Sequence, residues 1–296
     1  MSALAMVCNL TGLTADQVTF HTTFLGGGLG RKAEIDFISQ AVQVAIAIKR
    51  PVKLMWPREE DFTHDQYRPM ALVHARAGLD ASGQIAGWTY RNVSPSILGQ
   101  RGAPLGALGD SQAYEASQAL PCNFGAKLTE WVSHPAQVPV GFWRSVGASI
   151  DTFAVESMID ELAAAAGQDP LLFRRSRLND PRWIAVLEAA ANAAGWGTAP
   201  KAGAARGIAI GTAFNSIVAQ VVEVTAGTGG PKVTRVWVAI DCTLAVNPGS
   251  VEAQIVGGVG ELGVPTFAPA LANAWFKLSG KRVRTLPFFP NATMSD

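Results

Sequence analysis

Cysteine is scarce in this sequence: Cys8, Cys122 and Cys242 are the three cysteines among 296 residues, and they lie far apart. An odd number of widely spaced thiols excludes a disulfide framework, and it supplies neither a structural zinc site nor an iron–sulfur cluster. The four histidines show no metal-ligand spacing either. We therefore expect no metal to be bound directly by protein side chains.

Charge and long apolar runs are also in short supply. Charged residues make up 16% of the chain and the formal net charge is +1, which gives no reason to expect nucleic-acid binding. No apolar run reaches the roughly 18 residues that a transmembrane helix needs, and the first residues lack the order of a secretory signal. Hydrophobic residues, at 48%, are plentiful, so the chain can bury a large core.

The first third of the chain predicts a strand, a glycine turn and a helix. Residues 17–24 are rich in β-branched and aromatic side chains, which favours a strand leading into the glycines of 26–30. Apolar residues then recur at helical spacing until Lys-Arg-Pro at 49–51 ends the pattern. Residues 51–56 favour a short buried strand. We expect the N–H groups of the glycine turn to face a concave site, because residues without side chains allow close approach.

The middle of the chain predicts a hairpin and then a long loop. Two strand-like runs flank the Asp-Ala-Ser-Gly of residues 80–83, a composition typical of a hairpin turn. Residues 96–127 are rich in small residues and proline and favour a long loop.

Three helices with clear punctuation follow, and the pattern then changes to strands. The first helix is expected to start near Asp151 as N-cap and to end at Gly167. Asp169 and Asp180, each followed by proline, are the expected N-caps of the next two. Strands are expected at 217–224 and 232–242, joined as a hairpin. The fold class is α+β, and the change from helices to strands places a boundary near residue 203.

The stretch Phe-Leu-Gly-Gly-Gly-Leu-Gly-Arg-Lys-Ala, which starts at residue 24, leaves several readings open on its own residues. A phosphate-binding P-loop needs a hydroxyl after the lysine, and Lys32 is followed by Ala33, so that reading fails. A dinucleotide fingerprint is a weak match. The alternative without a ligand is a tight turn packed against another backbone.

Six segments in order carry a resemblance that spans nearly the whole chain. They are FLGGGLGRKAEIDF, PVKLMWPREEDFTHDQYRP, VPVGFWRSVG, ESMIDELAAAAGQDPLLFRR, AIDCTLAVNPGSVEAQIVGG and GELGVPTFAPALANAWFKLSGKRVRTLPF. They resemble the C-terminal part of the molybdenum-cofactor-binding large subunit of the xanthine dehydrogenase and aldehyde oxidase family, particularly the isoquinoline 1-oxidoreductase type. The resemblance implies a partial molybdopterin-binding domain, with residues 1–203 in a first subdomain and 204–296 in a second.

The resemblance assigns cofactor-binding roles to two groups of residues. The loop that contacts the cofactor through its backbone corresponds to Gly26, Gly27, Gly28, Leu29 and Gly30. Gln220 and Gln254 resemble the polar side chains that hydrogen-bond the pterin, although a glutamine in a strand usually faces solvent. The implied cofactor is a molybdenum–pterin group, expected in its cytosine dinucleotide form.

The resemblance also assigns the chemistry. Glu261 resembles the glutamate that acts as general base in the water-derived hydroxylation of an N-heterocycle or aldehyde, whereas a glutamate among glycines is otherwise most often an exposed loop residue. Arg144 resembles the arginine that stabilises developing charge on the oxo side of the metal. Arg68 corresponds to an arginine that orients substrate, and the alternative for it is a surface salt bridge.

A partner follows from the missing cysteines. Electrons have to leave the molybdenum, and this chain has no thiols arranged for a cluster. A separate iron–sulfur subunit is therefore implied. The bacterial cytoplasm and the periplasm both remain open as compartments.

Two departures from the family pattern predict a fragment with an internal deletion. The sequence starts shortly before the glycine loop, where relatives have a long preceding portion, and Gln254 is followed almost directly by Glu261, where relatives have a substantial intervening segment. Leu262 and Val264 also differ from the common Gly-Glu-Pro-Gly-Thr. The competing hypotheses are a non-catalytic remnant that binds no cofactor and a nucleotide-binding protein that uses the glycine loop.

Overall fold

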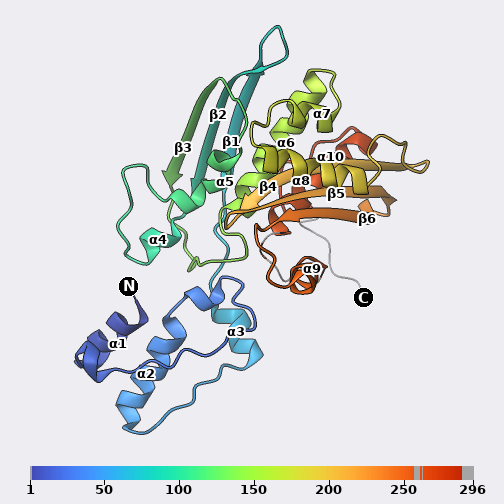
Figure 1. Cartoon of the computed structure of the whole chain (residues 1–296). Coiled ribbons are helices and arrows are strands. Elements are labelled where there is room, and N and C mark those ends of the chain that lie inside the picture. Colours follow the sequence, from blue (N-terminus) through green and yellow to red (C-terminus); the bar gives the residue numbers. More distant parts are fainter. Residues whose placement is uncertain (1, 257–260, 262, 289–296) are drawn as a thin grey trace. The chain divides into compact units, whose positions relative to one another are not determined.

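The computed structural model describes residues 2–256, 261 and 263–288, and Figure 1 shows their helices and strands. The chain divides into two compact units. The first consists of Met1–Leu72, Asn92–Ala113 and Trp131–Val146, and the second of Val73–Arg91, Tyr114–Glu130 and Gly147–Asp296. The predicted subdomain boundary near residue 203 stays a prediction. Each unit is described separately below.

The first unit is mainly helical. Its α-helices are α1 (Ala3–Thr11), α2 (Asp36–Ile48), α3 (Arg58–His64) and α4 (Ile97–Gln100). Helix α1 begins at an N-cap, Ser2, whose side chain accepts a hydrogen bond from the N–H of Ala5 (3.2 Å). Helix α2 ends at Lys49, whose φ of 53° is left-handed, in agreement with the predicted end at 49–51.

The second unit is built around an antiparallel sheet of three strands. These are β4 (Ala204–Ala213), β5 (Ser216–Gly227) and β6 (Gly230–Asp241), paired in that order. The unit also contains helices α5 (Glu115–Ala119), α6 (Ala148–Ala165), α7 (Pro170–Arg175), α8 (Pro181–Ala193), α9 (Pro248–Val256) and α10 (Val264–Ser279). Strand β5 is buried along most of its length, because α8 and α10 both pack against it.

Helix α10 lies against β4 at backbone distance. A Cβ atom added to Gly207 would overlap the N–H nitrogen of Ala274 and the carbonyl oxygen of Ala270. Glycine in the strand and alanine in the helix therefore allow a closer approach than larger side chains permit. Ala209, Val222 and Val224 of the sheet and Leu271 of the helix complete this apolar contact.

A buried polar network connects the helices of this unit to β4. Arg174 of α7 is 2% exposed, and its Nε donates to Oε2 of Glu156 of α6 (2.8 Å). The same carboxylate oxygen accepts the backbone N–H of Ile210 in β4 (3.0 Å). Asp160 lies 3.8 Å from Arg174 and also accepts from Arg282 (2.6 Å). Charges this deeply buried are stabilised by being paired and hydrogen-bonded.

A second three-stranded sheet contains β1 (Leu72–Leu79), β2 (Ile85–Ser94) and β3 (Ala126–Ser133), in that order. The turn between β1 and β2 is the predicted Asp-Ala-Ser-Gly. Oδ1 of Asp80 accepts the N–H groups of Ser82 (2.8 Å) and Gln84 (2.9 Å), which closes the turn.

Most of the predicted helix ends and turns are confirmed. The side chains of Asp169 and Asp180 cap α7 and α8 and accept backbone N–H groups, with proline in the first turn of each helix. Gly167 and Gly195 follow α6 and α8 with φ of 63° and 60°. Strands β5 and β6 form the predicted hairpin. The α+β class is likewise confirmed.

Several predicted elements are wrong. Residues 17–24 and 51–56 form no strand, because no described residue pairs with either segment in a ladder. Asp151 does not cap α6; it lies inside the first turn, is fully buried, and accepts a hydrogen bond from the hydroxyl of Tyr90. The predicted loop of 96–127 contains short helices, α4 and α5 among them.

Candidate functional site

The glycine loop is an exposed turn. Residues 26–30 lie in neither a helix nor a strand, and Gly26 and Gly27 are exposed. Gly27, Leu29 and Gly30 have φ of 141°, 54° and 92°. Across the described residues, the N–H groups of Gly26, Gly27 and Gly28 donate to no protein acceptor. They are therefore available to a polar or anionic ligand.

One end of this loop packs against another backbone segment. A Cβ atom on Gly30 would overlap the carbonyl group of Phe142. Glu34, 8% exposed, fixes the same contact, since its Oε1 accepts the N–H of Phe142 (3.2 Å) and its Oε2 accepts from Nε of Arg101 (3.1 Å). The loop therefore combines a tight packing end at Gly30 with an open end at Gly26 and Gly27.

Arg68 is held against the turn that carries Arg144. Its guanidinium donates to the carbonyl oxygens of Arg144 (3.0 Å) and Val146 (3.3 Å) and lies 5.8 Å from the ring centre of Trp143. Next to it, Tyr67 exchanges backbone hydrogen bonds with the chain at 139–141. Three of the predicted motifs thus meet in the first unit: the glycine loop, the segment of Arg68 and the segment of Arg144.

The second unit brings together the other predicted residues. Gln220 of β5 is 4% exposed, and its Nε2 donates to the carbonyl oxygen of Gly263 (2.9 Å). A Cβ atom on Gly263 would lie 3.7 Å from Ile255 of α9, the neighbour of Gln254. Glu261 is half-buried and lies two residues before Gly263, and Gln254 is exposed. The strand, α9 and the Glu261 turn therefore converge.

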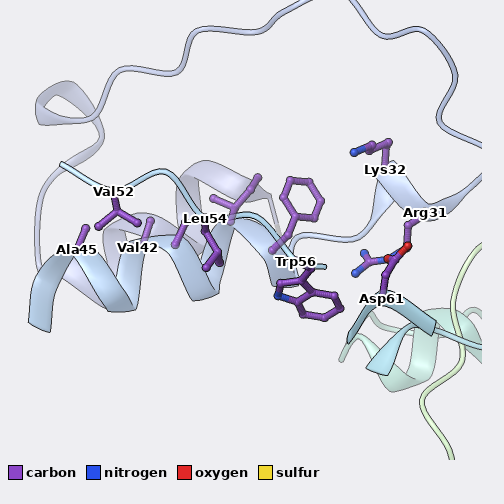
Figure 2. A pocket seen from close by; sticks show the side chains of 11 residues that line it. Arg31, Lys32, Val42, Ala45, Val52, Leu54, Trp56 and Asp61 are labelled. Carbon is purple, nitrogen blue, oxygen red and sulfur yellow. The ribbon is translucent and has the colours of Figure 1, made fainter. Parts of the chain in front are cut away.

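An apolar groove lies beside the glycine loop in the first unit. Its volume is about 560 Å³, and it lies between α2 and the segment 51–56. Figure 2 shows Val42 and Ala45 of α2 near Val52 and Leu54, with Trp56 farther along. The indole N–H of Trp56 donates to Oε1 of Gln40 (2.9 Å), which ties the segment to the helix. Helix α2 has no buried residue, so its apolar face is only partly covered.

Sequence reasoning missed the residues that hold these segments in place. Glu34 and Arg101 join the glycine loop to the segment of Phe142, and Gly263 joins Gln220 to the Glu261 turn. The sequence offered one indication for Glu34, because it is a charged residue at the start of an amphipathic segment. Arg101 had none, because its partner is 67 positions away.

Two further properties of the described residues bear on ligands. No group of three or more histidine, cysteine, aspartate or glutamate side chains among them is arranged to hold a metal ion. Within the same residues, no helix has the length and apolar character needed to cross a membrane.

Comparison with known proteins gives the family. The sequence profile described as "Molybdopterin cofactor-binding domain" matches residues 1–178. The chain is 26% identical to the beta chain of isoquinoline 1-oxidoreductase from Brevundimonas diminuta over 351 residues, which covers 95% of this chain and 44% of the relative. It is 32% identical to a nicotinate dehydrogenase subunit from Pseudomonas putida, covering 79% of this chain and 22% of the relative.

Solved structures agree with this at the level of the fold. Quinoline 2-oxidoreductase from Pseudomonas putida 86 matches with a TM-score of 0.58 and 18% identity, over 74% of this chain and 30% of that one. The aldehyde oxidoreductase from Desulfovibrio gigas matches with a TM-score of 0.54 and 19% identity, over 78% of this chain and 28% of that one. The chain belongs to the molybdopterin cofactor-binding domain family of the xanthine dehydrogenase and aldehyde oxidase type of oxidoreductases. It spans less than half the length of the two relatives named above.

The residues present fit a pterin cofactor. The glycine loop offers backbone N–H donors without side chains in front of them, because Cβ atoms on Gly26 and Gly27 would meet no atom within 4 Å. In the second unit, Oε1 of Gln220 is buried and has no hydrogen-bond partner among the described residues. Donors suit phosphate and oxo groups, and an amide oxygen suits the N–H groups of a pterin.

Proposed function

We propose that this chain forms part of the cofactor site of a molybdenum hydroxylase large subunit, which oxidises an N-heterocycle or an aldehyde with oxygen derived from water. The observation that carries the proposal is the convergence of Gln220, Gly263 and the Glu261 turn in a chain of this family. The substrate class is suggested by the relatives, which are named for isoquinoline and nicotinate.

The chain's own residues would hold the cofactor as follows. The proposed cofactor contacts are the N–H groups of Gly26, Gly27, Gly28, Leu29 and Gly30 in the first unit and the side chains of Gln220 and Gln254 in the second. We propose the cytosine dinucleotide form of the cofactor, on the resemblance to the isoquinoline type. When bound, the molybdenum–pterin group supplies the two-electron oxidation.

Glu261 is the proposed general base. A half-buried carboxylate near the reacting oxygen removes the proton of the attacking hydroxyl group and leaves that oxygen nucleophilic. Arg144 is proposed to stabilise the negative charge that develops on oxygen. For Arg68, the contact with the carbonyl oxygen of Arg144 supports a role in holding that arginine, in addition to the predicted contact with substrate.

We further propose that this chain acts with a partner subunit and that it lacks an internal segment present in its relatives. The relatives are named as subunits, which supports a separate iron–sulfur subunit as electron acceptor. The alignment with the isoquinoline relative extends over 351 residues, more than the 296 of this chain, which supports an internal deletion. We therefore propose that the chain alone does not turn over substrate. The partly covered apolar face of α2 favours the second candidate, a non-catalytic remnant.

The test has two stages. Elemental analysis of the purified chain, coexpressed with and without an iron–sulfur subunit of this family, measures molybdenum. Bound molybdenum supports the cofactor site, and its absence in both preparations favours the remnant. In a form restored to the length of the relatives, Glu261→Gln should lower turnover by about two orders of magnitude or more, because the amide keeps the shape and loses the base. Turnover within a few-fold of the parent would remove Glu261 from its proposed role.

A further inference from the structure

Gln220 is a polar residue on a strand buried on both faces. It is 4% exposed and is paired across the sheet with Ala209 of β4 and Val238 of β6. Because side chains alternate along a strand, Gln220 lies on the same face as Val222 and Val224, which pack against α10. Burying an amide among such neighbours is unfavourable unless both of its ends are hydrogen-bonded.

One end of the amide is satisfied by the turn that precedes α10. Nε2 of Gln220 lies 2.9 Å from the carbonyl oxygen of Gly263. A carbonyl oxygen only accepts hydrogen bonds, so this contact fixes the orientation of the amide, with its NH₂ group toward Gly263. Gly263 is the N-cap residue of α10 and follows Glu261 by two positions.

The other end has no partner. Oε1 of Gln220 is buried and accepts no hydrogen bond from the described residues. A buried acceptor in this state needs an N–H or O–H group from a ligand or from an ordered water. One end of this rigid planar group is therefore paired with the turn before α10, and the other end is an acceptor without a partner among the described residues.

We propose that Gln220, already a proposed cofactor contact, is also a positioning residue: its Nε2 holds the turn that carries Glu261 through the carbonyl oxygen of Gly263, while its Oε1 is the atom left to accept the hydrogen bond from the cofactor. Its importance for catalysis rests on the proposed role of Glu261, but the hydrogen bond to Gly263 does not. Since the amide is planar, a ligand that orients Oε1 also orients the donor to Gly263. Binding of the cofactor and placement of the base are thereby coupled.

The hydrogen bond to Gly263 can be observed directly. The sequence contains two Gly–Val pairs in this region, Gly258–Val259 and Gly263–Val264. A protein labelled with [1-¹³C]glycine and [¹⁵N]valine therefore gives two carbonyl–amide correlations there, one reporting on Gly263 and one serving as reference. The exchange rates of the amides of Phe267 and Ala268, measured by mass spectrometry, report on the first turn of α10.

Three variants separate hydrogen bonding from packing. Gln220→Met keeps the volume and removes the donor, so the Gly263 carbonyl signal should shift and the two amides should exchange about ten-fold faster. Gln220→His places a ring N–H the same number of bonds from Cα and should restore both values. Val222→Ala, on the same face, should lower stability without moving the Gly263 signal. Should Gln220→Met fail to fold, Gln220→Asn, one methylene shorter, takes its place.

The outcomes decide the proposal. An unchanged Gly263 signal in Gln220→Met, an equal shift in Val222→Ala, or failure of Gln220→His to restore the signal would each overturn it. Addition of the extracted molybdenum–pterin cofactor to the chain assembled with its subunits should shift the Gly263 signal again in the parent and not in Gln220→Met. If Glu261→Gln keeps its turnover while these shifts appear, the proposed base is wrong and the hydrogen bond stands.

Discussion

The guanidinium of Arg68 donates a hydrogen bond to the backbone carbonyl oxygen of Arg144 over 3.0 Å, across 76 residues of sequence. The turn it holds is strained, because Ser145 and Val146 have φ of 66° and 45°, and a β-branched residue rarely adopts such angles. A second bond, to the carbonyl oxygen of Val146, completes a clamp on this turn. Arg68 and Arg144, which were predicted from separate motifs, therefore belong to the same hydrogen-bonded turn.

Replacing Arg68 by methionine should release this turn. Loss of two charge-assisted hydrogen bonds to backbone carbonyls should lower the free energy of unfolding by about 2–4 kcal/mol. Arg68→Lys should recover less than half of this, because an ammonium group lacks the planar fork that reaches both oxygens. Urea denaturation measures the change. Rapid tryptic cleavage after Arg144 in Arg68→Met, and not in the parent, would localise it; equal cleavage in both would contradict the clamp.

The glycine loop should respond differently at its two ends. Gly30→Ala introduces a Cβ that overlaps Phe142 and forces a side chain onto a φ of 92°, which should cost about 2–5 kcal/mol of stability. Gly26→Ala is the matched control, since its Cβ would meet no atom within 4 Å, and its effect should stay within about 0.5 kcal/mol. Thermal or urea unfolding compares them. Equal losses of stability would show that the loop is not packed at Gly30.

Removing Arg174 should be among the most damaging changes in the second unit. Arg174→Met leaves Glu156 buried without its cation, and breaking such a pair typically costs about 3–5 kcal/mol. Burial already raises the pKa of Glu156, with Arg174 opposing it. Without the arginine that pKa rises further, so the folded state binds a proton more readily than the unfolded state and the loss should shrink as the pH falls from about 8 to about 5.

Two comparisons check this prediction. The neighbouring Arg175 forms an exposed pair with Glu188, so Arg175→Met should cost about 1 kcal/mol or less. The double variant Glu156→Met with Arg174→Met should be more stable than Arg174→Met alone, because no charge is left unpaired. A double variant less stable than the single one would show that the pair itself, and not the stranded charge, dominates.

The carboxyl group of Asp241 should titrate in an unusual range. A hydrogen bond from Arg182 (2.8 Å), with another from the N–H of Thr243, lowers the pKa of Asp241 to about 2. The stabilisation by this ionised carboxylate is therefore present above about pH 4 and is lost as the pH falls toward about 2. Carbon-detected NMR titration should place the midpoint near that value in the parent. In Arg182→Met it should move up toward 3.8, the ordinary value. An unmoved midpoint would assign the shift to Thr243.

The helices could be predicted from the sequence where a local signal existed. Asp169 and Asp180 cap their helices with their own side chains, and the proline after each fits the first turn, so no distant residue is needed. Asp151 has the same residue type but is fully buried, and its hydrogen bond comes from Tyr90, 61 positions away. Asp151 therefore binds a residue that is distant in sequence and does not cap the helix that begins beside it.

The strands could not all be predicted from local sequence alone, because a strand forms only where another strand pairs with it. Residues 17–24 and 51–56 have strand-like composition, but a strand also needs a neighbour to pair with, and the described chain supplies none. Val52, Leu54 and Trp56 still alternate toward the groove beside α2, so the side-chain pattern survives without the ladder. Strand β4 was missed for a related reason. Gly207 and Gly211 weaken its pattern, and the need for them appears only when the helices are in place: α10 lies against Gly207, and Thr152 of α6 and Thr266 of α10 lie against Gly211.

The contact between Gly207 and α10 restricts how the second unit can move. Where a helix packs on a sheet through long side chains, those side chains can change rotamer and accommodate a small displacement of the helix. At Gly207 the backbone of the strand instead lies directly against the backbone of the helix, so no side chain can adjust. Helix α10 cannot approach β4 further at this point, and sliding along the strand would move Ala270 and Ala274 away from Gly207 and against positions that carry side chains. The proposed base, Glu261, is therefore followed from Val264 onward by a helix that is held in place against the sheet.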